Sequence, residues 1–240
     1  QRLLVLAIDA EEQASAGFWI GKCLQAAGRS SDAQEAFQMA AQRDPTGYYS
    51  ERANEILQGI HPLSSTSPYE ISINWDNERH LAELWMRSTF PLADDVNLQV
   101  LGPLRMDQRY RRGGKFLELS EYVLASREFE SLRQDLQQDA VNSFRLLPTL
   151  LNKGLFRTAI YTSRQILNLA GLDDAATMKA PSYFNHIRFG CYYQDLVLKA
   201  ASEEGFDPFF LYSIIRQESL FESHIQSSAG ARGLMQILPA

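Results

Sequence analysis

Apolar residues recur at helical spacing along most of this 240-residue chain, and alternating segments rich in β-branched residues are almost absent. Helical spacing puts the apolar side chains on one face of each helix, and that face must be buried against another helix. We expect such helices at residues 78–87, around 95–101, through 114–151 and at 155–169. The pattern predicts an all-α fold, a run of helices with short connections that is typical of an α-solenoid.

The clearest single motif is a helical hairpin near the start of the chain. Gly28 is expected to stop the first helix, and Ser31 and Asp32 to cap the second, which should end before Asp44. Small residues let two helices approach closely, while Phe37 fills the space between them. The positions that resemble the signature of a tetratricopeptide repeat are Ile20, Gly21, Ala33, Phe37, Ala40 and Pro45.

Composition along the chain suggests two domains. Residues 61–73 are rich in Pro and Ser and are predicted to form a connector. Pro181 and Gly190 interrupt the helical pattern farther on. We therefore predict a helical, tetratricopeptide-like superhelical domain over residues 1–185 and a second, incomplete α-helical domain over residues 186–240.

The charge balance argues against a nucleic-acid-binding function. The chain has 23 Lys and Arg against 29 Asp and Glu, a net charge of -6, whereas nucleic-acid binders usually carry a basic surplus. One basic cluster lies at residues 105–115, and we interpret it as a solvated loop between helices. A contact for an anionic polymer is the alternative.

Membrane and metal signals are weak. No apolar run approaches the roughly 18 residues of a membrane span, so membrane association is not indicated. Cys23 and Cys191 lie among apolar neighbours and are predicted to be small core residues. The four histidines lack the paired spacing of metal ligands, so the sequence predicts no metal site.

A carboxylate near the end of the chain is the strongest candidate for chemistry. Asp207 is a good N-cap and Pro208 suits the first position of a helix. Counted from this start, Glu218 falls on the same stripe as Leu211 and Ile215, at the C-terminal end of the helix. Apolar neighbours and the negative end of the helix dipole both favour a protonated carboxyl, which a general acid requires. The alternative is a helix-end glutamate that points into solvent.

Small residues follow this helix. Ser227 and Ser228 are possible caps, and Gly230 and Gly233 are three positions apart. On a helix these glycines would leave one face without side chains. That face would accept either another helix or a ligand, and the sequence leaves both open.

These two segments resemble the opening of the catalytic domain of soluble lytic transglycosylases. The resemblance extends from about residue 192 to 240, and the helical region before it is similar to the ring-forming domain of the larger members. The residues that carry it are Arg216, Gln217, Glu218, Ser219, Phe221, Ser227, Ala229, Gly230, Ala231, Gly233, Leu234, Met235, Gln236 and Pro239.

The resemblance implies a lysozyme-like fold that cleaves the β-1,4 bond between N-acetylmuramic acid and N-acetylglucosamine in peptidoglycan. Glu218 would be the single catalytic acid and base and would yield a 1,6-anhydro product, while Ser227, Met235 and Gln236 would line the glycan groove. The implied partner is the peptidoglycan glycan strand and the implied location is extracytoplasmic, without a cofactor. No protein partner is identified.

Two departures from the family pattern qualify this prediction. Leu238 stands where the family often has Met, a change of one apolar residue for another. Family members also continue with an Asn-Ala-Gly segment and a tyrosine that complete the groove. We therefore expect residues 1–240 alone to form an incomplete lysozyme-like domain without measurable glycan cleavage.

Two other functions remain open. A helical scaffold that binds peptide or glycan would give Glu218 no chemical role. A muramidase similar to goose-type lysozymes would hydrolyse the same bond, with Glu222 as a second carboxylate. Glu222 fits poorly, because two glutamates four residues apart on a helix point the same way rather than flanking a sugar ring.

Overall fold

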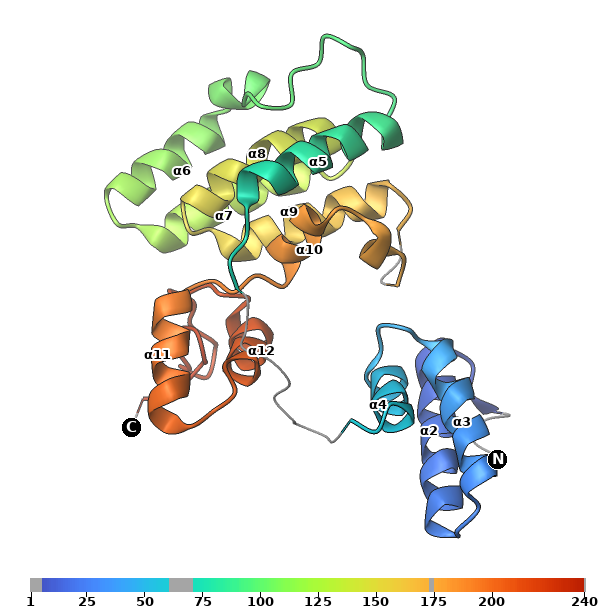
Figure 1. The fold of residues 1–240 in the computed structure, drawn as a ribbon. Coiled ribbons are helices and arrows are strands. Elements are labelled where there is room, and N and C mark those ends of the chain that lie inside the picture. Colours follow the sequence, from blue (N-terminus) through green and yellow to red (C-terminus); the bar gives the residue numbers. More distant parts are fainter. Residues whose placement is uncertain (1–5, 61–70, 173–174, 240) are drawn as a thin grey trace. The chain divides into compact units, whose positions relative to one another are not determined.

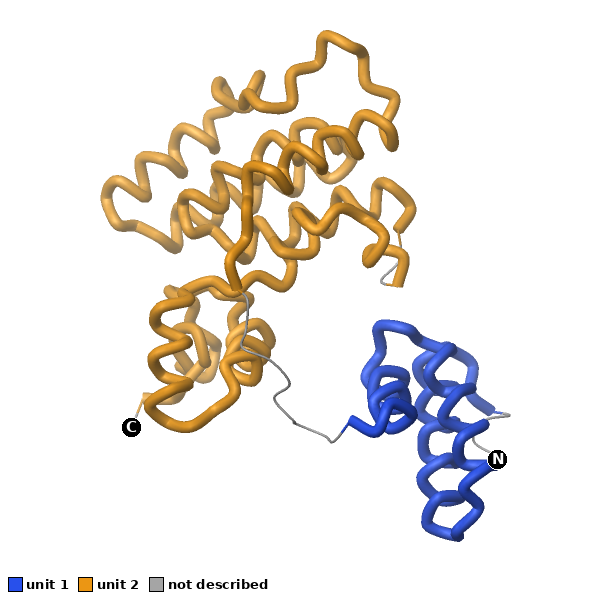
Figure 2. The backbone as a smooth tube through the Cα atoms, in the orientation of Figure 1, with its two compact units in different colours: residues 1–69 blue, residues 70–240 orange. Residues whose placement is uncertain are grey.

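The computed structural model describes residues 6–60, 71–172 and 175–239 (Figure 1). Within these ranges the regular structure is helical, with no strand longer than an isolated bridge. The all-α prediction is therefore confirmed. The chain divides into two compact units, residues 1–69 and 70–240, which are coloured separately in Figure 2.

In its described residues, the first unit packs one further helix against the two helices of the predicted hairpin. Phe37 lies so close to Gly21 that a Cβ atom on Gly21 would meet its ring at 2.6 Å, which explains why glycine is needed there. Gly28 has φ +74° and ends the first helix of the pair, as predicted. The helices are α2 (Ala10–Ala26), α3 (Ser30–Arg43) and α4 (Tyr48–Leu57).

Two details of this unit were predicted wrongly. Ser31 and Asp32 lie inside α3 rather than before it, and the N-cap position is taken by Arg29 without a side-chain hydrogen bond. Cys23 is exposed, and Cys191 in the second unit is only half-buried. Neighbours in sequence gave a poor guide to the burial of Cys23, because successive residues of a helix face different sides.

The second unit begins with a layer of helices around one large apolar core. Its fully buried members include Phe129, Phe144, Phe184, Leu147 and Ile166. The helices of this layer are α5 (Trp75–Thr89), α6 (Gln108–Glu118), α7 (Tyr122–Asp135), α8 (Ala140–Asn152), α9 (Phe156–Leu169) and α10 (Ser182–Arg188), with short 3-10 helices η1 (Gly102–Met106) and η2 (Ala176–Lys179).

The helix expected around residues 95–101 is absent. This segment is irregular, yet Leu98 is 2% exposed and belongs to the large core. Side chains from two helices satisfy its carbonyls: Arg145 donates to Asn97 O at 2.7 Å and Arg79 to Leu98 O at 3.3 Å. Leu98 thus anchors a largely exposed loop in the core, and the spacing of the apolar residues in this loop resembled that of a helix.

The basic cluster also differs from its prediction. Most of it lies in α6 rather than in a loop, and three of its charged residues form ion pairs. Arg109 pairs with Asp107 at 2.8 Å and with Asp135, and Arg112 pairs with Glu128 at 2.8 Å. These carboxylates offset the charges of Arg109 and Arg112, which reduces the basic character of the surface that α6 presents.

The C-terminal segment follows α10 in the same unit. It contains α11 (Gln194–Glu204) and α12 (Pro208–Ser219). Asp207 accepts a hydrogen bond from Phe209 N at 2.7 Å, so both the predicted cap and the helix start at Pro208 are confirmed. A second, smaller apolar core holds this segment against α9; its buried members are Ile160, Tyr192, Val197, Tyr212, Ile215 and Phe221.

The structure tests the predicted domain boundaries only in part. Most of the expected connector, residues 61–70 of 61–73, lies outside the described residues, and the division between compact units falls at residues 69 and 70. The boundary near residue 186 stays a prediction, and α10 spans that residue. None of the helices in the described ranges is long and apolar enough to cross a membrane.

Candidate functional site

Glu218 lies in the last turn of α12 and is exposed. The buried residues of this helix are Tyr212, Ile215 and Ser219, so the apolar stripe passes one position away from Glu218. The predicted burial of Glu218 is therefore wrong. The spacing from Leu211 was correct, but Leu211 itself is only half-buried and lies at the edge of the stripe.

The end of α12 is fixed by an unusual backbone. Leu220 and Phe221 have φ +50° and +65°, a left-handed conformation that costs non-glycine residues about 1–2 kcal/mol each. Leu220 N donates to Arg216 O at 3.1 Å, and the Phe221 side chain is 1% exposed. The Phe221 ring packs edge-on against Tyr192, with 5.1 Å between centroids. Burial of this ring offsets the strained turn.

The small-residue segment after α12 is a looped structure and not a helix. Gly230 and Gly233 have φ +88° and +73°, which only glycine adopts easily. Isolated bridges join Arg232 to Gln226 and to Ile237. The prediction of a helix capped at Ser227 or Ser228 is therefore wrong, and the glycines serve turns rather than a bare helix face.

Ser219 ties this loop back to α12. Its Oγ lies 2.8 Å from Leu234 O and 3.0 Å from Ile215 O, and it accepts a hydrogen bond from Phe221 N at 3.1 Å. The contact between Ser219 and Leu234 brings together two segments that sequence reasoning had placed in one site. Glu218 directly precedes Ser219 in the sequence, and Met235 directly follows Leu234, so both adjoin the residues that make this contact.

The other predicted groove residues make contacts inside the loop. Ser227 Oγ accepts a hydrogen bond from Ala231 N at 3.0 Å. Gln236 donates through Nε2 to Gly233 O at 2.9 Å and to Ile225 O at 3.3 Å. Met235 is 37% exposed. These side chains shape the loop, and their contact with a glycan stays a prediction.

A groove of about 760 Å³ adjoins the start of this loop. Residues of α7 and α9 form one side and residues 222–226 the other, so its lining ends one residue before Ser227. Arg157 Nη1 donates to Glu222 Oε2 at 2.9 Å, and this pairing raises the pKa of Arg157. His224 stacks on Tyr122, with centroids 4.0 Å apart and planes 5° apart.

Sequence reasoning missed Arg157 as part of this groove and Tyr122 as the stacking partner of His224. Both residues lie far from the loop in sequence, on helices whose apolar pattern indicates only which face of the helix is buried. Arg216 was noticed only as a motif residue. It donates to Arg188 O at 3.0 Å and lies 4.7 Å from the centroid of Phe189, and burial lowers its pKa.

No group of three or more His, Cys, Asp or Glu side chains among the described residues could hold a metal ion. The site consists of an exposed carboxylate at a helix end, a loop held by hydrogen bonds and a polar groove beside it. Such an arrangement suits proton transfer to an extended polar ligand.

Comparison with known families identifies this segment. Residues 195–240 match the family model described as the transglycosylase SLT domain. The resemblance recognised in the sequence is thereby confirmed over the segment that contains Glu218, Ser227, Met235 and Gln236. No curated protein matches the chain.

Solved structures extend the likeness in fold to most of the chain. The 70-kDa soluble lytic transglycosylase from Escherichia coli matches with a TM-score of 0.56 and 20% identity over 96% of this chain. A complex of the 70-kDa soluble lytic transglycosylase with bulgecin A matches with a TM-score of 0.53 and 18% identity over 96% of this chain. In both cases the match covers 30% of the solved chain.

Proposed function

We propose that these residues belong to a lytic transglycosylase that cleaves peptidoglycan. The observation that carries this proposal is the match of residues 195–240 to the transglycosylase SLT domain. The substrate bond is the β-1,4 link between N-acetylmuramic acid and N-acetylglucosamine. The likeness in fold to two solved lytic transglycosylase structures supports the same assignment.

Glu218 is the proposed acid and base. Its carboxyl protonates the leaving glycosidic oxygen and then accepts the proton of the muramyl C6 hydroxyl, which closes onto C1 to give the 1,6-anhydro product. The exposed position of Glu218 at the end of α12 leaves the carboxyl accessible to a glycan. Ser227, Met235 and Gln236 are the proposed glycan contacts, and proton transfer by a single carboxyl requires no cofactor.

The proposed substrate also implies a location and a partner. Peptidoglycan lies outside the cytoplasmic membrane, so we place the protein in the periplasm or cell envelope. Its partner there is the glycan strand. The acidic composition and the paired arginines of α6 are consistent with a polymer that is not a nucleic acid.

Digestion of purified sacculi by the protein at its natural full length tests the proposal. Glu218→Gln should abolish anhydro-muropeptides in the mass spectrum. Glu204→Gln is the matched control, because Glu204 is also an exposed glutamate at the end of a helix of this segment, α11. Products that survive Glu218→Gln, or that vanish equally in Glu204→Gln, would contradict the assignment.

A non-enzymatic scaffold is the second candidate, because an exposed glutamate at a helix end is also what a helix without a chemical role would carry. In that case folded protein would leave sacculi intact, and its binding to a partner would be unchanged by Glu218→Gln. The muramidase alternative loses support, because Glu222 is already paired with Arg157. A reducing muramic acid among the products would revive it.

A further inference from the structure

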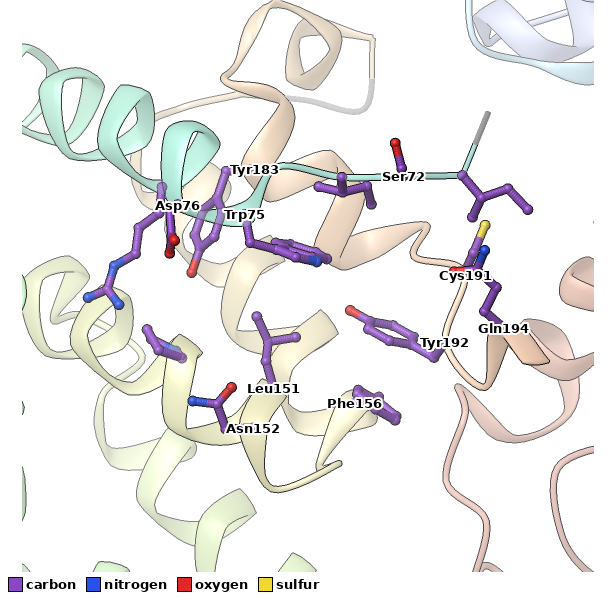
Figure 3. A pocket seen from close by; sticks show the side chains of 14 residues that line it. Ser72, Trp75, Asp76, Leu151, Asn152, Phe156, Tyr183, Cys191, Tyr192 and Gln194 are labelled. Atoms are coloured by element: carbon purple, nitrogen blue, oxygen red, sulfur yellow. The ribbon is translucent and has the colours of Figure 1, made fainter. Parts of the chain in front are cut away.

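A separate pocket of about 630 Å³ lies in the second unit, away from the predicted site residues (Figure 3). Its volume falls within the roughly 300–1,000 Å³ that is usual for small-molecule sites. Its wall comes from the residues before α5 and in its first turns, the end of α8, the start of α9, Tyr183 of α10, and residues 191–194, which lead into α11. Its lining includes the aromatic rings of Trp75, Phe156, Tyr183 and Tyr192 and the polar side chains of Asp76, Arg79, Asn152 and Gln194.

Aromatic rings make much of this wall, and neighbouring groups hold them in place. The rings of Phe156 and Tyr192 stack at 3.9 Å between centroids, and Tyr192 OH donates to Ile187 O at 2.8 Å. Trp75 meets Tyr183 edge to face at 6.1 Å. Figure 3 shows Trp75, Tyr183 and Tyr192 converging on the pocket from different elements. Tyr183 and Tyr192 are only 2% and 8% exposed, so they form the base of the wall, and Trp75 and Phe156, which are half-buried, supply most of the accessible ring surface. Because the rings are held by one another, this surface is preformed rather than assembled by a ligand.

Polar groups surround these rings. Burial raises the pKa of Tyr183 to about 12, so its hydroxyl remains a hydrogen-bond donor at neutral pH. Asn152 and Gln194 are exposed at the rim and can both donate and accept. The two charged lining residues, Asp76 and Arg79, have opposite signs, so the pocket carries no excess charge that would select an ion.

This combination of rings and rim matches the surface of a sugar. A pyranose ring presents C–H groups on its face and hydroxyls around its edge, and the partial positive charge of C–H groups suits the negative face of an aromatic ring. Amide and carboxylate side chains pair readily with hydroxyls. From the aromatic wall, the polar rim and the balanced charge, we infer that this pocket binds a neutral saccharide of one or two residues.

The pocket is distinct from the site around Glu218. Its lining ends at Gln194, one residue before the segment that matches the SLT domain, and includes none of the predicted site residues. The inference therefore does not rest on the proposed function. A saccharide bound here would be held by the helical layer and by the residues that lead into α11.

The indole N–H resonance of Trp75 reports directly on the pocket. The chain has three tryptophans, and loss of one signal in Trp75→Phe assigns it. Titration with chitobiose, the β-1,4-linked dimer of N-acetylglucosamine, should shift this signal saturably. The same titration of Glu218→Gln should give an unchanged dissociation constant, which separates this pocket from binding at the proposed catalytic residue.

Two asparagine variants give the matched comparison. Asn152→Ala removes a polar side chain from the pocket rim and should weaken chitobiose binding about tenfold, equivalent to about 1.4 kcal/mol. Asn77→Ala removes an exposed amide from α5 outside the lining and should leave binding unchanged. Absence of a saturable Trp75 shift, or equal effects of the two variants, would overturn the inference. A Trp75 shift with trialanine but not with chitobiose would also overturn it.

Discussion

The helical layer α5–α10 and the C-terminal segment of the same unit are stabilised in different ways. The layer surrounds a large core of fully buried side chains such as Phe144 and Leu147. The segment has a smaller core, and after α12 it relies on left-handed residues and on hydrogen bonds from Ser219 and Gln236. Periodic burial builds the layer, whereas specific polar contacts build the loop that carries the candidate site.

The largest stability effect should come from the layer. Phe144 is fully buried and its ring lies 5.9 and 6.0 Å from those of Tyr183 and Phe184. Phe144→Ala should lower the free energy of unfolding by about 3–5 kcal/mol, because it removes apolar contacts and leaves a cavity. Urea unfolding measures the change. Val123→Ala, at a site 49% exposed, is the control and should change it by less than about 0.5 kcal/mol.

A smaller effect is expected in the segment. Phe221→Ala should lower the opening free energy of α12 by about 3 kcal/mol, since the ring that offsets the left-handed turn is lost. Hydrogen exchange of the α12 amides measures local opening, which need not involve the helical layer. Phe210→Ala is the control, because Phe210 is 52% exposed on the same helix. Equal protection in both variants would mean that Phe221 does not hold the turn.

Ser219 tests whether hydrogen bonds hold the loop. Ser219→Ala removes the group that bonds Leu234 O and Phe221 N in a buried position, and should cost about 1–2 kcal/mol. Ser213→Ala removes a hydroxyl that bonds Phe210 O on the exposed side of α12, and should cost less. Exchange of the amides of Gly233 and Ile237, which bond Ile225 O and Arg232 O, reports on the loop. If these amides exchange at the same rate in Ser219→Ala, other contacts must hold the loop.

The same contrast explains what the sequence could predict. The start of α12 followed from Asp207 and Pro208, because a cap and a first-turn proline act locally. Gly21 facing Phe37 followed from residue size. The irregular segment at 95–101 did not, because its carbonyls are satisfied by Arg79 and Arg145 from other helices.

The candidate site, too, could be predicted from the sequence only in part. The motif containing Glu218 was recognisable, and the family match confirms the segment in which it lies. The exposure of Glu218 was not predictable, since a shift of one position around a helix separates a buried side chain from an exposed one. The loop conformation depends on positive φ values at Leu220, Phe221 and Gln236, which the residue types disfavour.

The smallest effect should come from the ion pair that joins the two regions. Arg157 and Glu222 are 42% and 22% exposed, so solvent screens their attraction. A double-mutant cycle with Arg157→Gln and Glu222→Gln should give a coupling free energy below about 1 kcal/mol, and 1 M salt should reduce it further. Urea unfolding of the four proteins measures the coupling. A salt-resistant coupling above about 2 kcal/mol would show that charge pairing, and not the small apolar core, attaches the segment to α9.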